Sequence, residues 1–308
     1  MIISTGMRTD IPAFYSEWLI NRIKEGFVLV RNPYEPKRVT RYELNPKIVD
    51  CITFCTKNPL PIIDKLHLLK DFRQFWFITL TPYGKNLEPN VPEKDKIINA
   101  FKKLSEILGK NAVGWRYDPI LFDDEFNVEK HIYSFEKTAK SLKGYTDLCV
   151  ISFLDVYQKV KRNAPNIYTP FFKEQKELGR AFAKIAKDNG ITIRSCCEGT
   201  HLKEFGIDVS GCQTKEVIER AANIRLDVSK KSSQRGVCDC LLGKDIGAYD
   251  SCAHLCKYCY ANSDARKVIE NVKRHDPLSP FLIGNYEKGD IITNADQKSF
   301  ISIQQSMF

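Results

Sequence analysis

Three cysteines in the last fifth of the chain are spaced so that they could bind one metal cluster. Cys252, Cys256 and Cys259 form a Cys-x3-Cys-x2-Cys motif within the run SCAHLCKYCYAN. Three thiolates so close in sequence can bind three irons of a four-iron cluster and leave the fourth iron open to a small-molecule ligand. A zinc knuckle completed by His254 or Cys240 is the alternative. The spacing favours iron and sulfur, and we expect His254 to be a solvated loop residue rather than a ligand or a donor to the cluster.

A second set of cysteines could form a closed metal site in the same half of the chain. The set comprises Cys196, Cys212, Cys238 and Cys240. Four thiolates suit either a second four-iron cluster or a structural zinc ion, and the sequence leaves both open. Cys197 competes with Cys196, since neighbouring residues on a strand face opposite ways. The remaining cysteines fall inside predicted strands, where we expect buried side chains without a metal: Cys51, Cys55 and Cys149.

The composition supports metal binding by these cysteines. The chain has 308 residues, 11 of them cysteine, with 43% hydrophobic and 28% charged residues, which excludes disordered, collagen-like and coiled-coil proteins. It has no apolar run near the ~18 residues of a membrane span and no signal-peptide core, so we expect a cytoplasmic protein. In that reducing compartment cysteines more often bind metal than form disulfides.

The net charge says little about partners. The formal value is +9, and two four-iron clusters held by seven thiolates would lower it to roughly +6. No block of five or six like charges occurs in the chain. The charge therefore allows a nucleic-acid partner without favouring one.

Strands and helices alternate along most of the chain. Apolar runs rich in β-branched and aromatic residues predict strands at 2–4, 49–55, 75–81, 112–117, 147–153 and 191–196. Helical periodicity lies between them, around 14–23, 97–108, 128–142 and 178–185. This alternation predicts parallel strands with right-handed crossovers, as in a complete or partial TIM-like α/β barrel. Residues 27–44 interrupt it with a predicted hairpin that turns at 32–36.

The amino-acid composition of the chain changes after Gly211. We expect residues 1–210 to form the barrel and residues 211–308 to form a cysteine-rich iron–sulfur segment packed on it as one structural unit. Short helices are predicted around 216–222 and 263–273, but 237–259 has few core-forming residues and needs metal to order it. If 245–249 is a strand beside 2–4, the barrel closes in permuted order and brings the cysteine motif to its functional face.

Polar residues follow nearly every predicted strand. The carboxyl ends of parallel barrel strands form the functional face, so we expect a polar cavity there. Asp118 before Pro119 could simply set a turn, and Arg116 with Asp118 could be a structural ion pair. The strand-end residues are Arg8, Asp10, Lys57, Asn58, Thr81, Tyr83, Arg116, Asp118, Asp155, Arg194 and Glu198.

The motif around Cys252, with Tyr258 directly before the last cysteine, resembles the cluster motif of the radical S-adenosylmethionine superfamily. In that family the open iron chelates the amino and carboxylate groups of the cofactor, and reduction yields a 5′-deoxyadenosyl radical. The runs TKNP, LTPYG and WRYDPI at 56–59, 80–84 and 115–120 are similar to strand-end motifs of spore photoproduct lyase, a member of that superfamily. The resemblance places Lys57 near the cofactor, and Arg116 with Asp118 near cofactor or substrate.

Nearly the whole chain, from RTDIPAFY to DIGAYDSCAHLCKYCYAN, also resembles the DUF1848 family. This resemblance supports the grouping of seven metal-binding cysteines with Cys196 rather than Cys197. It implies no substrate.

We therefore expect an iron–sulfur enzyme that starts radical chemistry from S-adenosylmethionine. Lys57, Arg116, Asp118 and Glu198 would bind cofactor or substrate, and Tyr83 or Tyr249 could donate hydrogen. The expected partners are a small-molecule or nucleotide-like substrate and a reducing electron donor such as flavodoxin or ferredoxin. One alternative is an enzyme that uses the open iron as a Lewis acid or sulfur carrier. Another is a nucleic-acid-binding protein with a structural metal and a basic phosphate-binding surface.

Overall fold

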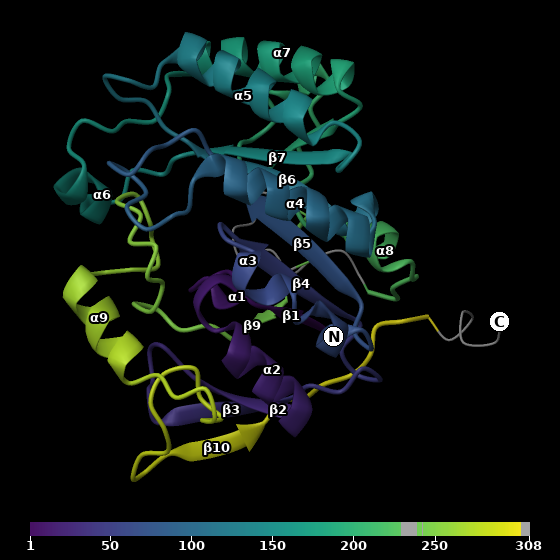
Figure 1. Cartoon of the computed structure of the whole chain (residues 1–308), viewed down its shortest axis with the longest axis vertical. Coiled ribbons are helices and arrows are strands. Elements are labelled where there is room, and N and C mark those ends of the chain that lie inside the picture. Colours follow the sequence, from purple (N-terminus) through teal and green to yellow (C-terminus); the bar gives the residue numbers. More distant parts are fainter. Residues whose placement is uncertain (229–238, 242, 303–308) are drawn as a thin grey trace.

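A seven-stranded parallel sheet forms the centre of the molecule. The computed structural model describes residues 1–228, 239–241 and 243–302. The strand order is β8-β7-β6-β5-β4-β1-β9, and every neighbouring pair is parallel (Figure 1). The six predicted strands are confirmed with small shifts at their ends. The strands are β1 (Ile2–Ser4), β4 (Cys51–Thr56), β5 (Gln74–Thr79), β6 (Val113–Ile120), β7 (Leu148–Phe153), β8 (Thr192–Ser195) and β9 (Lys244–Asp245).

The sheet does not close into a barrel within the described residues. Its edges are β8 and β9, which do not pair with each other there. The free edge of β8 is instead used by a later segment, since the N–H of Ser195 donates to the carbonyl of Asp208 over 2.9 Å and that of Asp208 donates to Ile193 over 3.2 Å. The α/β class and the parallel sheet are therefore confirmed, but no closed TIM barrel is found.

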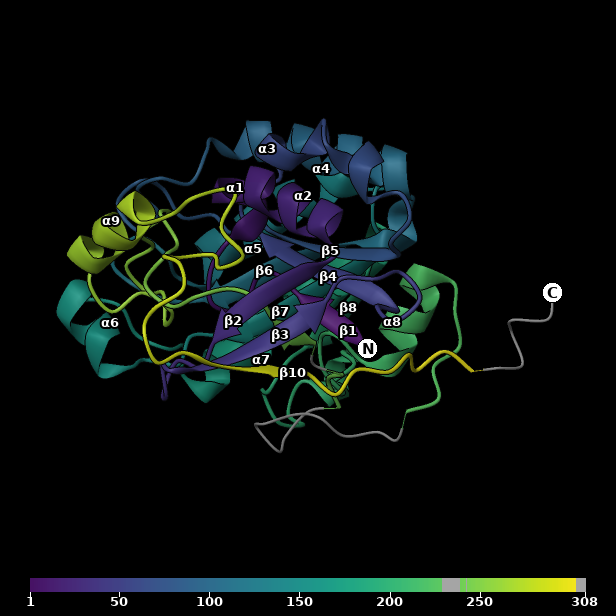
Figure 2. The ribbon, with the colours of Figure 1, turned by 90° about the horizontal axis from the view of Figure 1, so that it is seen from below.

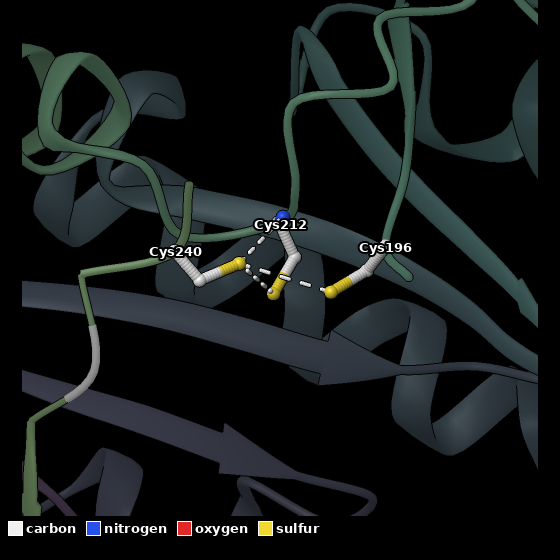
Figure 3. A group of neighbouring side chains, drawn as sticks. All are labelled: Cys196, Cys212 and Cys240. Atoms are coloured by element: carbon white, nitrogen blue, oxygen red, sulfur yellow. Dashed lines mark hydrogen bonds between the residues drawn. The ribbon is translucent and has the colours of Figure 1, made fainter. Parts of the chain in front are cut away.

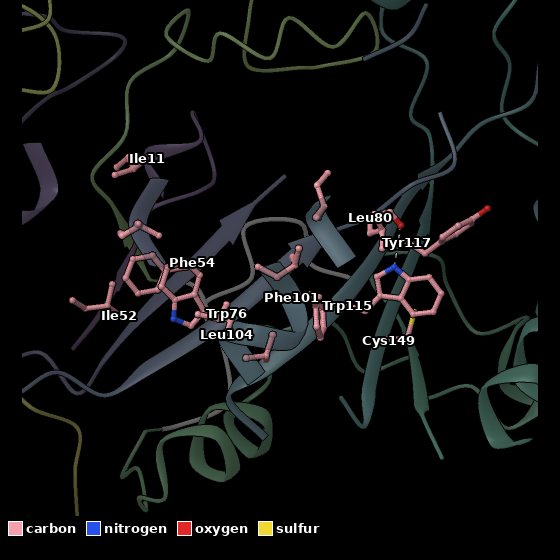
Figure 4. Close-up of a cluster of buried hydrophobic side chains, with 14 of the residues drawn as sticks. Ile11, Ile52, Phe54, Trp76, Leu80, Phe101, Leu104, Trp115, Tyr117 and Cys149 are labelled. Atoms are coloured by element: carbon pink, nitrogen blue, oxygen red, sulfur yellow. Dashed lines mark hydrogen bonds between the residues drawn. The ribbon is translucent and has the colours of Figure 1, made fainter. Parts of the chain in front are cut away.

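Helices cover one face of the sheet with a continuous core. On this face Phe54 stacks on Trp76 at 3.8 Å between ring centroids (Figure 4). Trp115 stacks on Phe135 at 4.7 Å. Phe135 in turn stacks on Phe182 at 4.0 Å, which joins two neighbouring helices. The helices of this layer are α1 (Ile11–Phe14), α2 (Ser16–Glu25), α3 (Leu60–Ile63), α4 (Lys94–Leu108), α5 (Val128–Leu142) and α7 (Phe172–Asp188).

The opposite face of the sheet is covered by the C-terminal third of the chain. Strand residues alternate between faces, so Phe75 and Phe77 point away from Trp76. They pack with Val217 and Ile218 of α8 (Lys215–Ala222) and with residues near Cys240. Two further helices, α6 (Gln158–Asn163) and α9 (Ala265–Lys273), lie at one side of the molecule in both ribbon views (Figures 1 and 2).

A small second sheet flanks the first. The predicted hairpin is confirmed as β2 (Phe27–Arg31) antiparallel to β3 (Arg38–Glu43). The C-terminal tail adds β10 (Ile291–Asn294) parallel to β3, which the sequence reading did not predict (Figure 2). Residues 211–308 thus contribute β9 to one sheet and β10 to the other, while the boundary at 210 stays a prediction.

Gly6 shows how tightly the end of β1 packs on β4. A Cβ atom at Gly6 would lie 2.3 Å from the carbonyl oxygen of Cys55, whereas one at Gly84 would meet nothing within 4 Å. We expect Gly6→Ala to lower the free energy of unfolding by at least ~1–3 kcal/mol, as overpacking typically does. Gly84→Ala is the matched control and should change it little. Urea unfolding of both variants checks this, and equal effects would contradict it.

Candidate functional site

The pairing of β9 with β1 decides where the cysteine motif lies. Ile3 is in register with Lys244 and Ser4 with Asp245, and the strands run parallel. The loop after β9 therefore leaves the sheet at the carboxyl ends of the strands, where Met7 and Arg8 also emerge. The strand that the sequence allowed at 245–249 is present only as Lys244–Asp245, so the pairing beside residues 2–4 is found but most of that range is not strand. The motif reaches the predicted face of the sheet even though the barrel is not closed.

Contacts with two earlier segments hold this loop in place, and we call residues 250–262 the cysteine loop. The Asn90 side chain donates to the carbonyl of Ala253 over 2.8 Å, and the N–H of Lys257 donates to that of Leu87 over 3.0 Å. The Tyr15 hydroxyl donates to the carbonyl of Ser251 over 2.6 Å. The loop is thus docked on the segment after β5 and on the start of the first helices.

His254 is part of this docking, so the prediction of a solvated residue is wrong. Its side chain is only 2% exposed, and its Nε2 lies 2.9 Å from Oδ2 of Asp10. The same Asp10 oxygen accepts the N–H of Lys57 over 2.8 Å, while Oδ1 accepts that of Ala13 and begins α1. Asp10 thereby links β1, β4 and the cysteine loop. This burial was not predicted, because nothing in the sequence indicates which distant residue would pair with the histidine.

The three thiols of the motif lie on one half-buried loop. Burial raises the pKa of Cys252 and, to about 12, that of Cys256, and the neighbouring Cys259 raises both further by charge repulsion. They are not among the described groups whose ligand atoms converge within 4.8 Å. Such wider spacing is compatible with a four-iron cluster, where each thiolate binds a different iron.

A buried ion cluster adjoins the cysteine loop. The Glu88 side chain is fully buried, and its Oε1 lies 2.7 Å from the Lys57 ammonium and accepts the Thr81 hydroxyl over 2.7 Å. Its Oε2 pairs with Lys94, and the Tyr258 hydroxyl also donates to Oε1. Burial would raise the pKa of Glu88, but the two lysines outweigh it and lower this pKa to about 2. Glu88 and Lys94 were missed, because a loop carboxylate seven residues beyond Thr81 has no sequence signature.

Lys57 lies between this cluster and Cys256 of the motif, and its predicted place near a cofactor stays a prediction. Burial would lower its pKa, but Glu88 and Cys256 outweigh that effect and raise it, so the ammonium stays charged. It also lies 5.7 Å from the ring centroid of Tyr258. A fixed positive charge beside Cys256 suits an anionic cluster or a bound carboxylate.

The predicted residues Arg116 and Asp118 form an ion pair on the face of the sheet opposite to the helix-covered core, which we call the inner face. Arg116 donates from Nε to Oδ2 of Asp118 over 2.9 Å, and Oδ1 accepts the Ser152 hydroxyl over 2.6 Å. Arg116 is in register with Thr79 and Val150, so these three side chains share that face. The structural ion pair allowed by the sequence is therefore present, and a role in binding stays a prediction.

Glu198 lies at the carboxyl ends of the strands, in the loop that follows β8. Its Oε1 accepts the N–H of Phe153 over 2.9 Å. Burial raises its pKa to about 8, and the nearby carboxylates of Asp118 and Asp155 add to this effect. The carboxyl can therefore hold a proton near neutral pH and donate a hydrogen bond.

Two residues of the cysteine loop that were not singled out from the sequence lie in the same region. The Tyr260 hydroxyl donates to the carbonyl of Met7, and burial raises its pKa, with Cys259 adding to the effect. Asn262 donates to the carbonyl of Cys252 over 2.7 Å, but its buried Oδ1 has no hydrogen-bond partner among the described residues. An unpartnered buried polar atom beside the motif is the kind of group that a ligand or water would satisfy.

A second group of thiols lies on the inner face, next to the guanidinium group of Arg116. Cys196, Cys212 and Cys240 converge so that their sulfurs all lie within 4.8 Å of one another, which would let them bind a metal (Figure 3). Cys238, the fourth predicted ligand, lies outside the described residues. The Cys197 thiol lies 3.9 Å from that of Cys196, since its backbone φ of 65° keeps the two side chains from opposite faces.

The remaining cysteines are not all core residues. Cys51 and Cys149 are buried, as predicted. Cys55 is only half-buried at the end of β4, where its sulfur lies 3.9 Å from the Thr79 hydroxyl. Its prediction as plain core is therefore wrong, because β4 ends on the polar inner face.

These features define an α/β protein with a parallel sheet and a cysteine group that could bind a metal. The family model described as Domain of unknown function (DUF1848) matches residues 2–261, so the chain belongs to this family. No curated protein and no solved structure matches the chain. Among the helices of the described residues, none has the length and apolar character needed to cross a membrane.

Proposed function

We propose that this protein is an iron–sulfur enzyme of the radical S-adenosylmethionine type. The observation that carries the proposal is the parallel pairing of β9 with β1, which brings the cysteine motif to the carboxyl edge of the sheet. Cys252, Cys256 and Cys259 would bind the cluster there. When bound and reduced, such a cluster supplies an electron that cleaves the cofactor.

The residues around the loop fit a cluster and a charged cofactor. Three half-buried thiols on one loop would hold three irons of such a cluster and leave the fourth iron open to the cofactor. Lys57 supplies a fixed positive charge for a carboxylate, and the unpartnered Oδ1 of Asn262 can accept a hydrogen bond from an amino group.

The inner face would bind the substrate. Arg116 and Asp118 present a donor and an acceptor side by side, and a protonated Glu198 adds a second donor. This mixture suits a polar small molecule or a nucleotide-like substrate. A reducing donor such as flavodoxin or ferredoxin would supply the electron.

An EPR spectrum of the anaerobically reconstituted, reduced protein tests the proposal. We expect a four-iron signal whose shape changes when S-adenosylmethionine is added, because the cofactor would bind the open iron. If the cluster is intact and its EPR spectrum does not change when S-adenosylmethionine is added, the radical assignment is overturned. This outcome would leave the alternative in which the open iron acts as a Lewis acid or sulfur carrier.

A further inference from the structure

The second thiol group has the spacing of a site for a single ion. Sγ of Cys240 lies 3.8 Å from Sγ of Cys196 and 3.6 Å from Sγ of Cys212. With metal–sulfur bonds of about 2.3 Å and tetrahedral angles, two thiolates on one zinc ion lie roughly 3.8 Å apart. In a four-iron cluster each thiolate binds a different iron, so its sulfurs lie farther apart.

Hydrogen-bond donors are directed at the same sulfurs. The N–H of Cys212 donates to Sγ of Cys240 over 3.2 Å, and Nη1 of Arg116 lies 3.9 Å from Sγ of Cys212. Donors of this kind stabilise metal-bound thiolates and orient them. Cys212 and Cys240 are buried, so a metal there would be shielded from solvent.

We propose that Cys196, Cys212 and Cys240 bind one divalent ion of the zinc type, and that this ion fastens the C-terminal segment to the sheet. The three ligands come from the end of β8, from the turn before α8 and from the approach to β9, which are distant in sequence. The same segments also pack in one apolar cluster with Ile2, Phe75 and Val217, so the ion would join elements that already meet on this face. The inference does not depend on the proposed enzymatic activity.

Metal analysis of the full-length protein tests this inference. Iron and zinc are measured after anaerobic purification of the wild type, Cys212→Ser, Cys256→Ala and the buried control Cys149→Ser. We expect about one zinc per chain in the wild type, lost in Cys212→Ser alone, while iron is lost in Cys256→Ala alone. Loss of iron in Cys212→Ser with no zinc in the wild type would overturn the inference, and so would a wild type that binds neither metal at this site.

X-ray absorption of the wild type keeps the test independent of whether Cys212→Ser folds. At the zinc edge we expect sulfur neighbours at about 2.3 Å and no second metal nearby. A zinc spectrum without sulfur neighbours would refute the assignment. The outcome of the EPR experiment is separate, because it reports on the cysteine loop.

Discussion

Cys256→Ala is expected to abolish binding of a catalytic cluster and with it all cleavage of S-adenosylmethionine. Cys256 is the central cysteine of the motif, the proposed cluster ligand, and lies beside Lys57 and Glu88. Loss of an outer partner of a metal ligand already costs roughly 10–100-fold in affinity or activity, and loss of a ligand should cost more. Iron content and the formation of 5′-deoxyadenosine under reducing conditions measure the effect.

Cys149→Ala is the matched control for this variant. Cys149 is buried in β7 within the helix-covered core, far from the cysteine loop in the sheet order. Its replacement should lower stability somewhat but leave iron content and cofactor cleavage unchanged. If Cys256→Ala kept both properties, the motif would not be the cluster site.

Glu88→Gln is expected to destabilise the protein more than any other single change of charge around the loop. The variant removes the fully buried countercharge of the half-buried Lys57 and Lys94, and breaking a buried pair typically costs ~3–5 kcal/mol. It also weakens the acceptor for Tyr258, which helps to hold the cysteine loop. Urea unfolding at neutral pH measures the loss.

Glu88 also predicts the acid sensitivity of the fold. Its pKa is lowered from 4.5 to about 2, which corresponds to a stabilisation of about 3 kcal/mol. This stabilisation is fully present above pH 4.5 and is lost as the pH falls toward 2, because the unfolded chain takes up the proton first. Stability measured against pH should therefore fall less steeply in Glu88→Gln across this window.

Glu93→Gln separates this effect from a general loss of negative charge. Glu93 pairs with Lys85 at 3.6 Å, but both side chains are more than half exposed. Exposed pairs contribute only ~0–1 kcal/mol, so this variant should unfold almost like the wild type. A loss as large as that of Glu88→Gln would contradict the assigned role of burial.

The sequence was informative wherever local pattern decides structure. The strands at 2–4 and 147–153 were predicted from β-branched and aromatic residues, and the hairpin at 27–44 from its turn at 32–36; all are present. The strand near 245 was predicted only conditionally, yet it pairs with β1. Its placement could be inferred because the cysteine motif had to follow a strand of the sheet in order to lie near the polar residues at the strand ends.

Features that depend on contacts distant in sequence were not predictable. Within the described residues the sheet stays open, and the edge of β8 pairs with residues near Asp208, which carry no strand signal. His254 is buried by Asp10, which lies 244 positions earlier in the chain. Glu88 is central only through four partners, Lys57, Thr81, Lys94 and Tyr258, and no spacing rule describes such a set.

The pairing of Ile3 with Lys244 also orders events during synthesis. At roughly 5–20 residues per second, a ribosome needs on the order of 10–50 s to make the chain between these two strands. During that time the outer edge of β1 has no neighbour, and exposed strand edges promote association with other chains. The motif cysteines emerge later still, so under the proposed function iron would reach them only after all seven strands of the sheet have been synthesised.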